Sequence, residues 1–315
     1  MTSVTQPPVP SGSTAQVGRA LAPAHRTALP RPEQSDRVRS TGDVLQIVGL
    51  LIISLIAYTL LVSPLFHMRA QHIAYNELRY QLANGISPVG HVTMSDTPVT
   101  TGTPLGVITI EKLGVNEVFL SGTTAQVLQS GPGHRRDSVL PGQSGASVIM
   151  GRHASFGGPF GKLDMLTAGD SVTTITGQGQ ATYRVTGIRR SGDPLPAVMS
   201  PGDGRLTLVS ATGRSFMPSD VIRVDMELIS DPFETPRAVV SAVELDDAEA
   251  AFASDSAAWP WVVIWLASWF AVFVLIRRLS WWWGRPQAWI VGVPAFALTT
   301  CLLGGAIMQV VPNLV

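Results

Sequence analysis

Three long stretches of the chain are apolar throughout. Residues 44–66, 258–276 and 288–311 contain no Asp, Glu, Lys or Arg. As a helix rising about 1.5 Å per residue, the first stretch would reach roughly 34 Å, which exceeds the hydrocarbon core of a bilayer. The pattern therefore predicts three transmembrane α-helices and a lipid bilayer as the first partner of the chain.

Short runs of β-branched and apolar residues alternate with turn residues between the first and second apolar stretches. The runs lie at residues 106–110, 116–120, 146–150, 171–176, 181–188, 205–210 and 221–228. Gly177 and Gly179 separate two of them and indicate a hairpin. Helical patterns fit residues 123–129 and 159–166. Many short strands with few helices predict a mainly β fold, a small barrel over residues 104–229.

The other segments have the composition of tails and linkers. Residues 1–43 are rich in Pro, Ser and Thr, and we expect a disordered tail. Residues 67–103 begin with a helical pattern and form a predicted stalk and linker. Residues 230–257 are acidic and predict a solvated linker, whereas residues 277–287 are predicted to form a basic turn.

The arginines predict the orientation of the chain in a plasma membrane. Cytoplasmic flanks carry the excess of Lys and Arg. Arginines occur before the first predicted span and again between the second and third, at Arg19, Arg26, Arg31, Arg37, Arg39, Arg277, Arg278 and Arg285. We therefore expect a cytoplasmic N-terminus and residues 67–257 outside the cytoplasm.

The composition excludes several classes of function. The 22 basic residues equal the 22 acidic ones, so the chain lacks the excess of positive charge that a nucleic-acid-binding protein needs. Its one cysteine, Cys301, lies in the third apolar stretch, which excludes a disulfide framework and Cys-ligated metal sites. No phosphate loop and no His/Glu metal spacing is visible, so we expect no cofactor and no metal.

Four segments of the predicted barrel carry a family resemblance. They are IEKLGVNEVFLSGTTAQVLQSGPGH (110–134), LPGQSGASVIMG (140–151), GRHASFGGPFGKLDMLTAGD (151–170) and TLVSATG (207–213). In order and spacing they resemble the sortase domain, most closely the class E sortases of high-GC Gram-positive bacteria. The resemblance implies a closed β-barrel with a Cys, a His and an Arg that transfer a peptide acyl group through a thioester.

The nucleophile of that chemistry is replaced. Aligning TLVSA with the TLxTC strand end of the family places Ala211 where the Cys is expected. A methyl group cannot form a thioester. Ser210 and Thr212 flank Ala211, but alternation along a strand directs their side chains to the opposite face. Neither is expected to substitute for the thiol.

The other two positions also depart from the family pattern. Aligning GRHASFGGPF with GHRxxxGxPF places Arg152 at the His position, with His153 one residue later. The Arg position falls on Val221 or Asp220, and Arg223 lies two residues beyond Val221 on the same strand face. These substitutions predict a sortase-like protein without the covalent chemistry.

Three hypotheses about function remain open. The first is an inactive sortase-like protein that holds an extended peptide in its groove, or docks a membrane protein through the last two spans, within a cell-envelope assembly or export system. The second is an active hydrolase or transpeptidase that uses His153 and Ser215. The third is a structural protein whose barrel is a spacer.

Several other polar residues are expected to have no catalytic role. His134 follows two glycines of a GPGH turn, so we expect its imidazole to bond nearby backbone. A second set is expected to be solvated, namely Arg135, Arg136, Asp137, Arg189 and Arg190. The small residues around Cys301 predict a packing face between spans.

Overall fold

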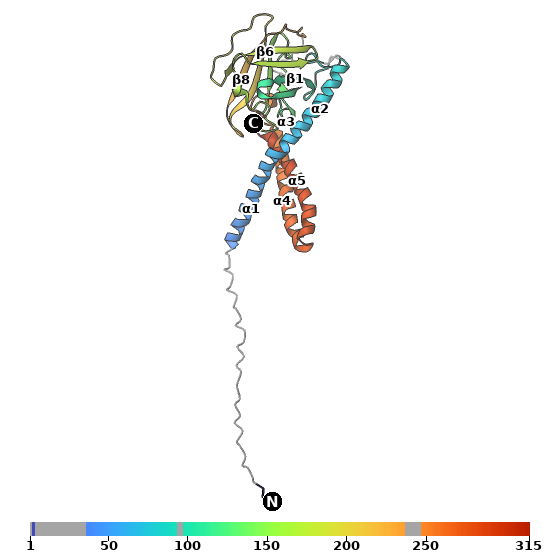
Figure 1. Cartoon of the computed structure of the whole chain (residues 1–315), viewed down its shortest axis with the longest axis vertical. Helices are drawn as coiled ribbons and strands as arrows, with labels where there is room; N and C mark the ends of the chain where they lie inside the picture. The colour runs from blue at the N-terminus through green and yellow to red at the C-terminus, as the bar shows by residue number, and fades with distance from the viewer. Residues whose placement is uncertain (1, 4–35, 93–96, 237–246) are drawn as a thin grey trace. The chain divides into compact units, whose positions relative to one another are not determined.

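The computed structural model describes residues 2–3, 36–92, 97–236 and 247–315. Two compact units divide the chain, Met1–Ile47 and Val48–Val315, and the second contains the barrel (Figure 1). Most of the predicted disordered tail and residues 237–246 of the predicted acidic linker lie outside the described residues. Residues 36–43 of that tail are helical, which corrects the prediction there.

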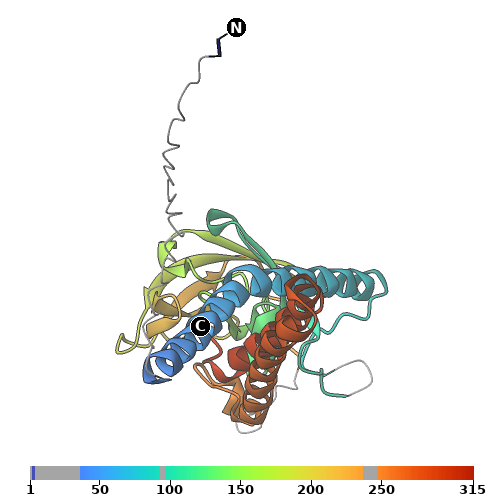
Figure 2. The same cartoon turned by 90° about the horizontal axis from the view of Figure 1, so that it is seen from below.

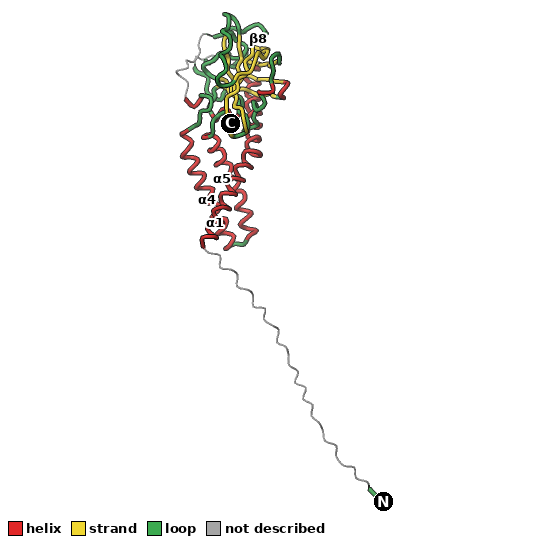
Figure 3. The backbone as a smooth tube through the Cα atoms, turned by 90° about the vertical axis from the view of Figure 1, so that its left-hand side faces the viewer, coloured by secondary structure: helices red, strands yellow, loops and turns green. Residues whose placement is uncertain are grey.

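Eight strands close into a barrel in the order β1-β2-β3-β4-β7-β8-β6-β5. They are β1 (Pro104–Ile110), β2 (Val115–Ser121), β3 (Gly133–His134), β4 (Gly145–Met150), β5 (Ser171–Thr176), β6 (Gly179–Arg189), β7 (Gly204–Arg214) and β8 (Met217–Leu228). Figure 3 shows these strands gathered in one body, in yellow. The predicted fold class is confirmed, a mainly β barrel accompanied by helices apolar enough to span a membrane.

Apolar side chains on one face of the predicted strands fill the interior of the barrel. Ile108 of β1, Val172 of β5 and Leu206 and Leu208 of β7 are fully buried and belong to one apolar core. Because successive side chains of a strand face opposite ways, the intervening residues face outward. The predicted hairpin is present, with Thr176 paired with Gly179 across the turn.

Three local predictions need correction. The helix predicted at residues 159–166 is only a 3₁₀ turn, Leu163–Met165. The helix predicted at residues 123–129 is α3 (Ala125–Ser130), which begins late because the Thr124 hydroxyl caps it by accepting a hydrogen bond from the Val127 N–H. The two-residue strand β3 was not predicted, since two residues are too short to show alternation.

Within the described residues, three helices are long and apolar enough to cross a membrane. The first joins α1 (Asp36–Ala57), the π-helical turn η1 (Tyr58–Val62) and α2 (Ser63–Ala83). The others are α4 (Trp259–Trp282) and α5 (Arg285–Val310), which lie side by side (Figures 1 and 2). The basic turn predicted at residues 277–287 is wrong in extent, because α4 continues to Trp282 and α5 begins at Arg285.

Small residues let α5 approach its neighbours closely. A β-carbon added at Gly292 would overlap the Ile276 side chain of α4, and one added at Gly304 would overlap the ring of Tyr58 in η1. Gly304, which belongs to the predicted small-residue packing face, therefore packs against Tyr58 of the same chain.

Candidate functional site

The end of β7 presents two different faces. Ser210 faces the barrel interior, as Leu206 and Leu208 do, and is fully buried. Its hydroxyl donates to the carbonyl oxygen of Gly151 at 2.9 Å. Ala211 faces the other way, into an apolar cluster outside the main core. The expectation that Ser210 is directed away from the position of Ala211 agrees with this alternation.

Ala211 is covered rather than open to a substrate. Its exposed fraction is 1%, and its cluster contains Leu128, Met150, Val209, Val221 and Leu314. Ala251 and Phe252 pack against the same cluster. Leu314 comes from the short segment that follows α5, so residues distant in sequence cover the methyl group of Ala211.

Arg152 is a buried cation beside this cluster. Its side chain has no exposed surface. The guanidinium donates to the Ser155 hydroxyl at 3.0 Å and to the carbonyl oxygens of Val315, Ala125 and Met308 at 3.2, 3.1 and 3.5 Å. Burial lowers the pKa of Arg152 to about 10, which leaves it charged at neutral pH.

Among the described residues, no Asp or Glu forms an ion pair with Arg152. Its Nε atom is buried and lacks a hydrogen-bond partner. The guanidinium also lies over the ring of Phe156, 5.3 Å from its centroid. Arg152 therefore binds main-chain oxygens and an aromatic face, and it has no basic lone pair with which to replace a histidine.

His153 and Ser215 lie in different surroundings. His153 is half-buried, and its main-chain N–H donates to the carbonyl oxygen of Leu314 at 2.9 Å. Ser215 is exposed in the turn between β7 and β8, and within the described part of the chain no hydrogen bond joins the two side chains. The structure does not bring together a base and a hydroxyl nucleophile there.

The final strand offers no buried guanidinium beside Ala211. Val221 pairs directly with Ala211 across the β7–β8 ladder and is 6% exposed. Arg223 pairs with Val209, two residues away on the same face, and is half-buried. Asp220 accepts hydrogen bonds from Ser191, which lower the pKa of its carboxyl group.

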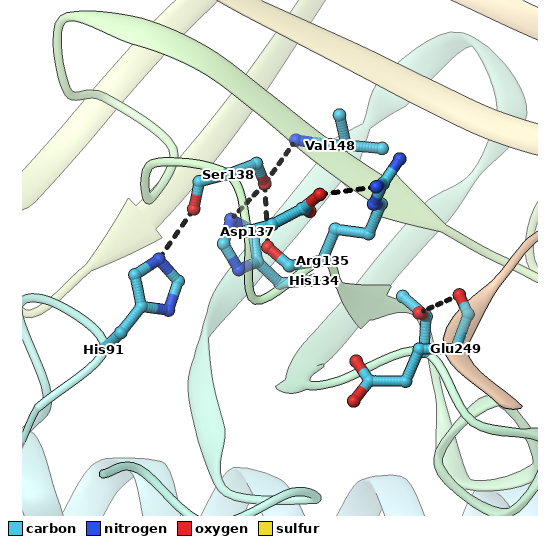
Figure 4. A network of polar contacts seen from close by, with 8 residues as sticks. His91, His134, Arg135, Asp137, Ser138, Val148 and Glu249 are labelled. Carbon is cyan, nitrogen blue, oxygen red and sulfur yellow. Dashed lines mark hydrogen bonds and ion pairs between the residues drawn. The ribbon is translucent and has the colours of Figure 1, made fainter. Parts of the chain in front are cut away.

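A second polar cluster surrounds His134, and Figure 4 shows it. His134 is fully buried, and its Nε2 donates to the carbonyl oxygen of Val139 at 2.8 Å. The Ser138 hydroxyl lies 3.3 Å from the same nitrogen. His91 stacks on His134 with ring centroids 5.8 Å apart, and its Nε2 bonds the carbonyl oxygen of Ser138 at 2.7 Å. The expected backbone contact of His134 is confirmed.

This Ser–His contact is structural. Because Nε2 of His134 carries the proton it donates to Val139, it cannot accept a proton from Ser138. The Ser138 hydroxyl donates instead to the Arg135 carbonyl oxygen at 2.8 Å and accepts from the Val148 N–H at 3.1 Å. Burial lowers the pKa of His134 to about 3, so it stays neutral near pH 7.

Several charges expected to be solvated are paired instead. Arg135 pairs with Asp137, as Figure 4 shows, and Arg189 pairs with Asp225. Arg136 pairs with Glu249, which is 1% exposed although it lies in the segment predicted to be a solvated linker. These ion pairs are consistent with structural roles, since barrel folding brings partners together that the sequence places far apart.

Comparison with known proteins agrees with the architecture. Residues 108–216 match the family model described as the sortase domain. The barrel is sortase-like. Sortase D of Bacillus subtilis (strain 168) is 29% identical over 85 residues, which are 27% of this chain and 41% of that protein. The chain thus matches less than half the length of this curated relative.

Solved sortases also resemble this chain. A sortase D5 transpeptidase of Clostridium perfringens is 22% identical with a TM-score of 0.43, over 51% of this chain and 99% of its own. Sortase E of Streptomyces avermitilis is 27% identical with a TM-score of 0.37, over 48% of this chain and 100% of its own.

The sortase-like barrel holds one feature that sequence reasoning missed. Asn313, Leu314 and Val315 are buried beside Ala211 and Arg152, with exposed fractions of 0%, 0% and 2%. Nothing in these residues signals this position, because they follow an apolar span without a motif. Among the described residues, no group of three or more His, Cys, Asp and Glu side chains is placed to hold a metal ion.

Proposed function

We propose that this chain is a membrane-anchored, catalytically inactive sortase-like protein. In this proposal it serves as a peptide-binding or scaffolding subunit of a cell-envelope assembly or export system. The observation that carries the proposal is Ala211, a methyl group at the expected nucleophile position, buried in an apolar cluster that includes Leu314. A thioester requires a thiol, and a buried methyl group offers neither a nucleophile nor access.

The helices support a scaffolding role. Only 6% of the most apolar window of the second candidate span is buried, and 28% of that of the third. Six tryptophans near the ends of α4 and α5 are exposed by 56–84%, namely Trp259, Trp261, Trp281, Trp282, Trp283 and Trp289. Such rings suit a membrane interface, and the remaining apolar surface is free for lipid or for another membrane protein. In this proposal residues 67–257 face outward from the plasma membrane.

The active alternative has less support. It needs His153 beside a nucleophilic hydroxyl, yet Ser215 is exposed in a turn and the two side chains share no hydrogen bond within the described residues. The spacer hypothesis predicts that changing the charges around Arg152 and Arg223 leaves the cellular role of the protein intact. Because Arg152 is completely buried, the half-buried Arg223 is the residue with which to test it.

Two measurements on the full-length protein in mild detergent test the proposal. The protein is incubated with a peptide carrying a sorting signal and with an amine acceptor, and intact-mass spectrometry follows acyl-protein and product. We expect neither, and His153→Ala and Ser215→Ala should change nothing. A covalent acyl adduct on the unsubstituted protein would overturn the inactive assignment.

The scaffolding role is tested by purification from the native membrane and mass spectrometry of the proteins that co-elute. We expect a membrane protein in stoichiometric amount. Recovery of the chain alone, under conditions in which known envelope complexes survive, would contradict a stable scaffold.

A further inference from the structure

The segment after α5 is bound to the barrel as an extended peptide. Leu314 places its side chain in the apolar cluster over Ala211, and its carbonyl oxygen accepts from the His153 N–H at 2.9 Å. The next carbonyl oxygen, that of Val315, accepts from the Ser155 hydroxyl at 2.5 Å and from Arg152 at 3.2 Å. Consecutive main-chain oxygens and one apolar side chain are thus bound together, as in peptide recognition.

Asn313 fixes the other end of this short segment. Its side-chain amide donates to the carbonyl oxygens of Thr123 at 3.0 Å and Ala250 at 2.9 Å. Its main-chain N–H donates to the carbonyl oxygen of Ala253 at 2.9 Å. Residues 250–253 therefore lie across the segment, and Phe252 packs against the cluster that contains Leu314.

The chemistry of the site favours a ligand over simple packing. A fully buried guanidinium is costly unless its donors are satisfied, and Arg152 meets this requirement partly through Val315. Without residues 313–315, Arg152 and the Ser155 hydroxyl would lose these acceptors, and the cluster that contains Ala211 would lose the Leu314 side chain. The barrel therefore presents two polar donors and an apolar pocket that need an occupant.

We propose that residues 313–315 are an intramolecular ligand, and that they occupy the site beside Ala211, Arg152 and Ser155 in place of a separate extended peptide with an apolar side chain. Another peptide enters only after these residues leave. Because α5 ends at Val310, five residues before Val315, movement of this helix relative to the barrel would open or close the groove. This inference rests on the peptide-binding form of the proposed function, and the labelling arm below tests the occupancy separately from peptide binding.

A thiol at position 211 reports directly on this occupancy. Cys301 is the one cysteine of the chain, so Cys301→Ser provides a background without thiols. In that background, full-length protein in detergent carries Ala211→Cys, and the rate of maleimide labelling is measured by intact mass. We expect slow labelling in the otherwise intact chain and labelling about 10- to 100-fold faster after Leu314→Ala or removal of residues 313–315.

Two further reporters separate groove opening from unfolding. Val198→Cys lies at a site that is 99% exposed and should label fast in every background, whereas Leu206→Cys lies in the core and should stay protected. Leu298→Ala, on an exposed part of α5, is the matched control for Leu314→Ala and should leave the labelling of position 211 unchanged. If removal of residues 313–315 also speeds labelling at position 206, the barrel itself has opened. The labelling rate of position 211 in the Leu314→Ala protein then tests the occupancy.

The peptide arm uses acetylated Pro-Asn-Leu-Val as the probe. Added to the protein that lacks residues 313–315, it should restore slow labelling of position 211, whereas the same residues in scrambled order should not. Fast labelling of position 211 in the intact chain would overturn the occupancy. Failure of the peptide to protect a folded, truncated protein would overturn the peptide site.

Discussion

Acidification should destabilise the barrel through His134. The imidazole is fully buried beneath His91 and its pKa is lowered by burial from 6.5 to about 3. An unfolded chain takes up a proton at this residue below about pH 6.5, whereas the folded barrel does so only near pH 3. Between these two values the unfolded state binds more protons, so the free energy of unfolding falls as the pH falls.

The size of the effect follows from the shift. Each pH unit below the ordinary pKa costs about 1.4 kcal/mol, so acidification to pH 5 should lower the free energy of unfolding by roughly 2 kcal/mol. For a domain of this size that corresponds to a decrease of about 8 °C in melting temperature. His91 adds to the loss in the same direction, because burial also lowers its pKa.

The assay must observe the sheet rather than the helices. All eight tryptophans lie between residues 259 and 289, outside the barrel, so Trp fluorescence would not report on it. The β-sheet amide I band in the infrared, followed against temperature at pH 7.5 and pH 5 in detergent, separates strands from helices. We compare the unsubstituted protein with His134→Gln, which keeps a donor for Val139 but cannot titrate, and with His72→Gln at an exposed position.

We expect the decrease in sheet melting temperature to be much smaller in His134→Gln and unchanged in His72→Gln. The remaining decrease in His134→Gln should come from His91. Equal decreases in all three proteins would refute the reasoning, because they would mean that the buried imidazole does not link folding to protons.

Three substitutions test other parts of the barrel by the same infrared melting at pH 7.5. Tyr183→Phe removes the hydroxyl that accepts the buried Gly142 N–H at 2.5 Å, and we expect a loss of about 1–3 kcal/mol; an unchanged melting temperature would contradict this. Arg189→Met leaves the buried carboxylate of Asp225 without its cation and should cost about 3–5 kcal/mol, with partial recovery when Asp225→Leu is added. Gly106→Ala would force a methyl group against a carbonyl oxygen of β5 and should cost about 2 kcal/mol or more, whereas Gly187→Ala, with open space around its α-carbon, should not.

Local sequence patterns predicted the strands and the apolar helices, because these elements depend on residues close together in the chain. The segment at residues 171–176 is rich in β-branched residues, which favour strands, and it forms β5. The apolar stretch at residues 44–66 needs no partner to be identified, since its hydropathy alone suits a bilayer. The family resemblance drew on motifs at residues 110–134 and 207–213, and the matched region covers residues 108–216.

Contacts between distant residues could not be predicted in the same way. Arg152 stands at the His position of the family resemblance, and no local pattern predicts that folding buries it against Val315, 163 positions later. Glu249 reads as part of a solvated acidic segment, yet it pairs with Arg136 of the barrel. No sequence period predicts such pairs, because they depend on which distant segments the fold brings into contact.

The sequence by itself determined three apolar spans, a mainly β domain and the absence of a thiol at position 211. Each follows from residue identity or from a period of a few residues, and none of the three depends on how distant parts of the chain pack. Only the tertiary structure decided that the methyl group of Ala211 lies in one buried cluster with Leu314 and that Arg152 donates to main-chain oxygens. The physical reason is that burial belongs to a position in the folded chain, and the cluster around Ala211 combines side chains from α3, β4, β7, β8 and the segment after α5.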